Sequence, residues 1–250
     1  MPDSITIFRE AFASYKKNFT DYATYSFTTF VLSGAMALAL VALFLIMGVL
    51  SAGGIFSTLV SGNNFSLGLV GIGVTVLILA VAFATFLWLQ SGLIGAYFDS
   101  LHGINSGRKA NVFAMLKAIP RFASGVFMVS VLATIISGFP LVLFGVLGGV
   151  IGGMAGILLL FFGIIFTMLL SVSFMFSVPG VVLDRKGALA ALSGSFFKVT
   201  RNISSVAVFL IICLVLAIPN ILPLFSLLYV PLFYMPLTYA ALLMLYRKAT

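Results

Sequence analysis

The sequence predicts an all-α, polytopic membrane protein with six transmembrane helices arranged as three hairpins. Hydrophobic residues make up 62% of the 250-residue chain and charged residues only 7%, which is too few to cover a soluble globule of this size. Every Asp, Glu, Lys and Arg falls in one of four short clusters, and the stretches between them, 22–98, 122–183 and 202–246, contain none. A charge at the centre of a membrane helix costs at least about 2.5 kcal/mol, so this partition indicates insertion into a bilayer.

Each uncharged stretch is long enough for two crossings of ~20 residues and has turn-forming residues near its middle. These glycine, serine, asparagine and proline residues lie at 51–54 and 61–64, at 145–156 and at 219–223. We therefore expect one integral membrane domain over residues 1–250, built from hairpin units at about 1–98, 99–183 and 184–250.

Pairs of crossings return every charged cluster to one side of the membrane. Three crossings in the longest stretch are the alternative, but they would separate the basic residues of 99–121 from another basic cluster, against the positive-inside tendency. We expect a multi-pass protein of the plasma membrane with both termini cytoplasmic. Charged residues from Asp3 onward argue against a cleaved signal peptide.

An apolar stripe with helical spacing precedes the first predicted hairpin, at Ile5, Phe8, Phe12, Tyr15 and Phe19. Adding 184 to these numbers gives a second apolar stripe, at Leu189, Leu192, Phe196, Val199 and Ile203. Adding 104 gives a weaker one, at Val112, Leu116 and Ile119. These stripes predict a cytoplasmic-side amphipathic helix before each hairpin, in a threefold repeat. Chance similarity between apolar sequences is the alternative.

The same register superposes three basic residues, Lys17, Arg121 and Arg201, at the expected membrane edge. We expect these side chains to reach lipid phosphate groups, because a basic residue near an anionic surface contributes ~1 kcal/mol. Further basic residues share that expected face: Arg108, Lys109, Arg185 and Lys186. The predicted partners are therefore anionic membrane lipids, with another membrane protein or a second copy of the chain as alternatives, and no nucleic acid.

Residues 174–202, FMFSVPGVVLDRKGALAALSGSFFKVTRN, resemble a signature of a prokaryotic superfamily of six-helix membrane proteins. This superfamily includes the membrane domain fused to some glycerophosphodiester phosphodiesterases. The matching positions are Pro179, Asp184, Gly187, Ala191, Ser193 or Ser195, and Arg201, and the opening segment ending in Tyr15, Lys16, Lys17 and Asn18 is also similar. The resemblance implies the six-helix fold. It implies no activity, because the phosphodiester chemistry of the fused members belongs to a separate domain.

Residues able to carry chemistry are few. Asp99 and His102 could share one helix face, but two ligands do not make a metal site. The single cysteine, Cys213, lies in an apolar run and is expected to be a buried hydrophobe, and Asp184 is expected to cap the helix that follows it. We predict no catalytic, cofactor or metal site, and hence no cofactor.

Pro231 and Pro236 are predicted to kink the last span and to free carbonyl groups near Leu227 and Leu232. Three classes of function remain. We favour a non-enzymatic membrane protein that anchors or organises partners, binds anionic lipid at the cytoplasmic face, or does both. The alternatives are a permease or channel for a small neutral or amphiphilic solute, which would use the kinked helix, and a lipid-modifying enzyme using Asp99, His102 and Asp184.

Overall fold

A computed structural model describes residues 3–61 and 65–249, with side chains described outside 53–72. Every regular element in this part of the chain is helical, which confirms the all-α class. The elements are α1 (Ser4–Lys17), α2 (Phe19–Ser61), α3 (Phe65–Asn105), α4 (Val112–Ile151), α5 (Gly153–Ser173), α6 (Ser177–Leu183), α7 (Ala188–Arg201), α8 (Ile203–Ala217), η1 (Ile218–Ile221), α9 (Pro223–Tyr229), the π-helical η2 (Val230–Tyr234) and α10 (Met235–Lys248).

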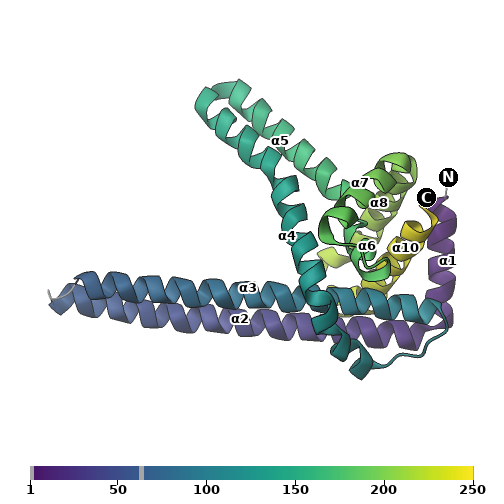
Figure 1. The fold of residues 1–250 in the computed structure, drawn as a ribbon, viewed down its shortest axis with the longest axis horizontal. Helices are drawn as coiled ribbons and strands as arrows, with labels where there is room; N and C mark the ends of the chain where they lie inside the picture. Colours follow the sequence, from purple (N-terminus) through teal and green to yellow (C-terminus); the bar gives the residue numbers. More distant parts are fainter. Residues whose placement is uncertain (1–2, 62–64, 250) are drawn as a thin grey trace.

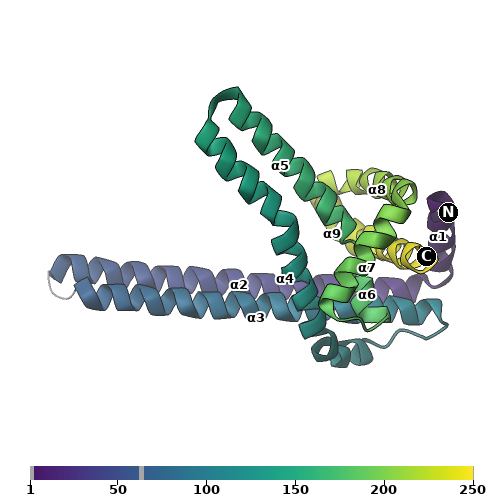
Figure 2. The same ribbon diagram turned by 45° about the horizontal axis from the view of Figure 1, so that its top comes forward.

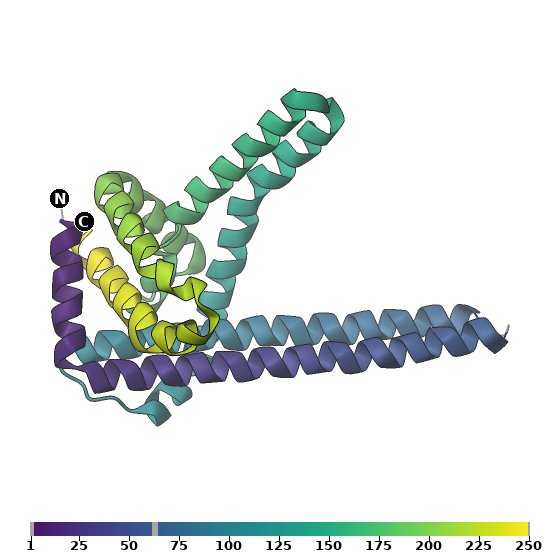
Figure 3. The ribbon, with the colours of Figure 1, turned by 180° about the vertical axis from the view of Figure 1, so that it is seen from behind.

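The molecule consists of a compact body from which two helical arms project in different directions (Figure 1, Figure 2). Helices α2 and α3 lie side by side in the long arm, and α4 and α5 lie side by side in the short arm. We use "long arm" for residues 31–87 and "short arm" for residues 135–169. The body contains α1, α6 to α10 and the remaining parts of α2, α3 and α4, and both chain ends lie at its edge (Figure 3).

Among the described residues, six helical segments are long and apolar enough to cross a membrane. They are Phe19–Ala52, Gly73–Asn105, Val112–Ile151, Gly153–Leu183, Ile203–Ile221 and Pro223–Lys248. Length and composition therefore agree with a multi-pass membrane protein.

Helices α2, α3 and α4 are about twice as long as the predicted spans of ~20 residues. Their inner ends are buried in the body, which accounts for the extra length. In α2, burial ends near Thr29, and large apolar side chains are exposed from Val31 to Leu50. At 1.5 Å per residue these residues alone measure about 30 Å, enough to cross a bilayer's hydrocarbon core, and α2 continues beyond them to Ser61.

The predicted turns have different outcomes. The chain breaks between α4 and α5 at Gly152 and Gly153, whose φ angles of 67° and 57° favour glycine, and this confirms the turn within 145–156. The short helix η1 confirms the turn at 219–223. A turn at 51–54 is wrong, because α2 continues to Ser61, and most of 61–64 lies outside the described residues.

The predicted 184-residue register is confirmed between the first and third units. Helices α1 and α7 are both 14 residues long and begin and end 184 positions apart. Each is followed by an asparagine with nearly the same backbone angles, φ −119° and ψ 36° at Asn18, φ −120° and ψ 32° at Asn202. The side-chain NH2 of each asparagine donates to the carbonyl four residues earlier, on Ser14 and Lys198. The asparagine side chain thus helps to end both helices, and its backbone carbonyl accepts from an N–H of the following helix, that of Tyr22 or Val206.

The middle unit lacks this device. Phe122 occupies the position equivalent to Asn18, and α4 runs without interruption from Val112 through Pro120 to Ile151. The prediction of a separate amphipathic helix there is wrong, because no polar side chain is present to take over the backbone hydrogen bonds at that point. Residues 112–121 form the first turns of α4 instead.

Part of the predicted stripe on α1 is buried and part is exposed. Phe8 and Tyr15 pack into the body, with the Phe8 ring 5.3 Å from that of Phe209. Ile5, Phe12 and Phe19 remain 57%, 46% and 48% exposed. The equivalent residues before and at the start of α8, Leu189, Phe196 and Ile203, are also exposed. Both helices thus keep a second apolar face after packing on their neighbours.

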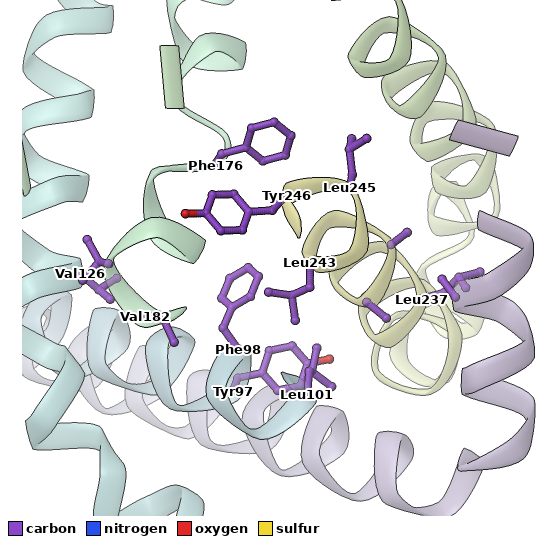
Figure 4. Close-up of a cluster of buried hydrophobic side chains, with 14 of the residues drawn as sticks. Tyr97, Phe98, Leu101, Val126, Phe176, Val182, Leu237, Leu243, Leu245 and Tyr246 are labelled. Atoms are coloured by element: carbon purple, nitrogen blue, oxygen red, sulfur yellow. The ribbon is translucent and has the colours of Figure 1, made fainter. Parts of the chain in front are cut away.

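The core of the body surrounds α10, most of whose apolar side chains are buried. Figure 4 shows Leu243 and Tyr246 of α10 among Tyr97 and Phe98 of α3 and Phe176, which precedes α6. The last helix in sequence is therefore central in space, because elements from all three units pack around it.

Candidate functional site

All charged residues of the chain lie in the body, and neither arm contains any. The body therefore holds every group able to bind an ion or a charged headgroup. Three polar clusters can be distinguished on it: the loop between α3 and α4, the surroundings of Tyr246, and a cavity between α1, α3 and α10.

The predicted lipid-binding residues are not gathered at one point, and all of them are exposed except Lys186, which is half-buried. Lys17 and Arg201 end α1 and α7, and Arg121 lies in α4, where its guanidinium carbon is 5.3 Å from the centre of the Phe122 ring. Arg108 and Lys109 belong to the loop after α3, and Arg185 and Lys186 to the loop after α6. A single lipid molecule could therefore not contact all seven basic residues, and only several lipid molecules side by side could.

Contacts from α2 hold the α3–α4 loop in place. The backbone N–H of Ala110 donates to the Asp21 carboxylate at 3.2 Å, and that of Asn111 donates to the Tyr25 hydroxyl at 2.8 Å. Asn111 in turn caps α4 by accepting from the N–H of Ala114. These contacts position Arg108 and Lys109 beside a cavity of about 160 Å³, which Asp99 also lines.

Asp184 does not cap α7, so that prediction is wrong. The N-cap position is Gly187, which has no side chain to accept a hydrogen bond. The Asp184 carboxylate instead accepts from the Tyr246 hydroxyl at 2.5 Å and pairs with the Lys186 ammonium at 2.9 Å. Asp3 does cap α1, by accepting from the N–H of Ile5.

Lys198 completes the cluster around Tyr246. Its ammonium nitrogen lies 4.1 Å from the centre of the Tyr246 ring and donates to the carbonyl of the same residue at 3.1 Å. Burial lowers the pKa of Lys198, although the charge of Asp184 opposes this. For Asp184, burial acts to raise the pKa, but the hydrogen bonds from Tyr246 and Lys186 outweigh it and leave the pKa below its ordinary value.

The lowered pKa predicts a pH dependence of stability. A carboxyl that is more acidic in the folded protein stabilises it above the unfolded pKa, and this contribution is lost as the pH falls through the folded pKa. We expect Asp184→Asn to lower the melting temperature at about pH 6 and to have a progressively smaller effect as the pH falls below about 3.9, since the unaltered protein then loses the charge as well. Melting curves of both proteins across this range would test it. An equal difference at every pH would contradict it.

Of the two serines in the family-like segment, Ser195 is the buried one. Its hydroxyl donates to the carbonyl of Ser173 at 2.7 Å and accepts from the N–H of Phe176 at 3.0 Å. It thereby satisfies backbone groups that the break between α5 and α6 leaves open. Ser193 is exposed and bonds within its own helix.

A cavity of about 320 Å³ with several polar side chains lies between α1, α3 and α10. Glu10 and Ser14 line it from α1, His102 and Asn105 from α3, and Leu243, Met244, Arg247 and Lys248 from α10. Sequence reasoning did not assemble this group, because Glu10 and Lys248 are 238 positions apart yet form a 2.6 Å ion pair. Their opposite charges at the two chain ends were the only signal.

A hydrogen-bond network supports one wall of this cavity. The side-chain carbonyl of Asn105 accepts from the Ser14 hydroxyl at 2.9 Å and from the Tyr22 hydroxyl at 2.7 Å. On another wall, the Arg247 guanidinium lies 3.4 Å from Nε2 of His102. The cavity is thus lined by groups whose orientation is set by contacts between separate helices.

The residues of the enzyme alternative do not converge. Asp99 lines the cavity beside the α3–α4 loop, His102 lines the cavity between α1, α3 and α10, and Asp184 lies with Tyr246. In the part of the chain that the structure describes, no three His, Cys, Asp or Glu side chains are grouped closely enough to hold a metal ion.

A hydrogen bond from α1 replaces one that is lost at the second of the two predicted proline kinks. Pro231 lies in the π-helical turn η2, and Pro236 lies in the first turn of α10. Pro236 cannot donate to the carbonyl of Leu232, and the Tyr15 hydroxyl of α1 donates to that carbonyl instead, at 2.5 Å. A carbonyl freed by the kink is therefore used to fasten α1.

Comparison with known proteins found no matching family model, curated protein or solved structure.

Proposed function

We propose that this protein is a non-enzymatic integral membrane protein of the plasma membrane that binds anionic lipid at its cytoplasmic face and anchors or organises partners there. The observation that carries the proposal is the separation of charge from apolar surface. All charged groups lie in the body, whose formal charge is +8, and the arms expose long apolar surfaces without a single charge. Such a molecule can place its arms in lipid and its cations against headgroups.

Helices α1 and α7 support this proposal in more detail. Each exposes apolar side chains, Ile5 and Phe12 on α1 and Leu189 and Phe196 on α7, with Phe19 and Ile203 exposed at the start of the next helix. Each also ends in an exposed basic residue, Lys17 or Arg201. This combination is typical of helices that lie in the membrane interface, with apolar side chains at the acyl boundary and cations at the phosphates.

In this arrangement the arms form hairpins that cross the membrane and both termini are cytoplasmic. The exposed faces of the arms are suited to lipid, to another membrane protein or to a second copy of the chain. Any of these could be the partner that the protein organises.

The experiment compares two triple variants that lose the same charge. Lys17→Gln with Arg121→Gln and Arg201→Gln should weaken phosphatidylglycerol binding by about 3 kcal/mol, roughly a hundredfold, at ~1 kcal/mol for each cation. The control replaces Arg9, Lys16 and Lys117 with Gln, which are exposed basic residues outside the repeat register. Native mass spectrometry of gently extracted protein measures lipid binding and retained subunits together. Equal weakening in both variants would show that only net charge matters.

A further inference from the structure

The cavity between α1, α3 and α10 has the chemistry of an anion site. Arg247 forms no ion pair within the described residues, and its guanidinium carries a fork of donors that matches a phosphate group. The neighbouring Lys248 is neutralised by Glu10, so Arg247 supplies the net positive charge of the cavity.

Asn105 adds a second, oriented donor. Its side-chain carbonyl already accepts from Ser14 and Tyr22, and both partners are themselves held on α1 and α2. The amide NH2 is therefore the part of Asn105 left to donate to a ligand. Nε2 of His102 accepts from the Arg247 guanidinium at 3.4 Å, which helps to hold that guanidinium in place.

The remaining wall is apolar and leaves room for an organic group. Leu243 and Met244 line it, and the half-buried Met244 supplies its accessible surface, since Leu243 is only 2% exposed. The cavity's volume of about 320 Å³ lies at the lower end of the range for small-molecule sites and exceeds what a phosphate group alone would occupy.

The cavity faces away from the apolar surface of α1. Glu10 and Ser14 each lie two residues from Phe12, about 200° around the helix, so they are on the side opposite Ile5, Phe12 and Phe19. If the exposed apolar face meets lipid, the cavity opens toward water. A ligand would then enter from the aqueous phase.

We infer that this cavity binds a small, water-soluble phosphate ester, with the phosphate held by Arg247 and Asn105 and the organic group against Met244. The site is independent of the lipid-binding residues, since Lys17, Arg121 and Arg201 do not line it.

Calorimetric titration of the detergent-solubilised full chain with phenyl phosphate tests the inference. We expect one ligand per chain, and at least about tenfold weaker binding after Arg247→Gln. Asn105→Asp is the second variant, because an aspartate can still accept from Ser14 and Tyr22 while its charge repels phosphate. It should weaken binding by a similar factor. Arg9→Gln, an exposed change at a residue that does not line the cavity, should bind as the unaltered protein does.

Failure of phenyl phosphate to bind the unaltered chain, or undiminished binding to a folded Arg247→Gln or Asn105→Asp variant, would overturn the inference. Competition by short-chain phosphatidylglycerol at equal concentration would also overturn it, by assigning the cavity to a lipid headgroup. Inorganic phosphate that binds as tightly as phenyl phosphate would overturn the inference of an ester, because the apolar wall would then contribute nothing to binding. The triple variant of Lys17, Arg121 and Arg201 should keep full phenyl phosphate affinity. Loss of lipid binding alone in that variant, or of phosphate binding alone in Arg247→Gln, distinguishes the two proposals.

Discussion

Replacing Gly92 with alanine is expected to destabilise the protein by about 1 to 3 kcal/mol, because the added methyl group has no space. A Cβ at this position would lie 2.7 Å from the backbone oxygen of Ile119, 2.8 Å from its Cγ2 and 2.9 Å from the Cβ of Ala123. A backbone atom cannot move aside as a flexible side chain can. Helices α3 and α4 would have to separate where the two arms leave the body.

Gly138→Ala is the matched control, since a Cβ at Gly138 meets no atom within 4 Å and the residue also lies inside a long helix. Thermal unfolding in detergent can be followed through the single cysteine, Cys213, with a thiol-reactive dye. Gly138→Ala should leave the melting temperature unchanged or raise it slightly. Equal melting temperatures for the two variants would mean that α3 and α4 do not cross closely at Gly92.

Tyr15→Phe is expected to cost about 1 kcal/mol, because the half-buried carbonyl of Leu232 loses its hydrogen-bond donor. The Tyr15 hydroxyl is the donor that replaces the missing N–H of Pro236 at the carbonyl of Leu232. Its ring also contacts the rings of Phe19, Tyr22 and Phe233, which the phenylalanine would preserve. The variant therefore isolates the hydrogen bond from the packing.

Loosening of α1 is the structural consequence to measure. Tyr15→Phe should raise the rate of proteolysis within α1 and lower the melting temperature, since α1 packs against α10 and α8. Tyr234→Phe is the control, because the Tyr234 hydroxyl makes no hydrogen bond within the described residues. If Tyr234→Phe were cleaved quickly and Tyr15→Phe stayed resistant, the hydroxyl of Tyr234 and not that of Tyr15 would be the one that holds α1 in place.

Helix α1, at the N-terminal end of the chain, is held by contacts with α8 and α10 near the C-terminal end. Glu10 of α1 pairs with Lys248 of α10, and the hydroxyl of Ser4 donates to the carbonyl of Ser205 in α8 at 2.6 Å. Through these contacts the first helix joins the last unit. The cavity between α1, α3 and α10 lies at this junction, so its walls exist only when these contacts are made.

The helical class, the six apolar segments, the turn at Gly152 and Gly153 and the 184-residue register could all be predicted from the sequence. Each depends on local chemistry. Bilayer thickness sets the length that an apolar segment needs to cross it, and a positive φ favours glycine. An asparagine can end a helix because its side-chain NH2 donates to a backbone carbonyl of the last turn. The same reasoning failed for residues 112–121, since an amphipathic pattern does not reveal whether a helix stops before the next one begins. It failed for Asp184 because its strongest partner, Tyr246, is 62 positions away.

By itself, the sequence of this protein determined which parts can enter a membrane, because the cost of burying a charge acts on each residue wherever it is placed. The sequence also showed where basic residues flank the apolar segments and where prolines interrupt the last of them. Only the tertiary structure decided what those residues meet: that Tyr15 satisfies the carbonyl at the kink, and that Arg247, His102 and Asn105 surround one cavity. Such contacts join helices from opposite ends of the chain, and their geometry arises from packing around α10, which no local pattern encodes.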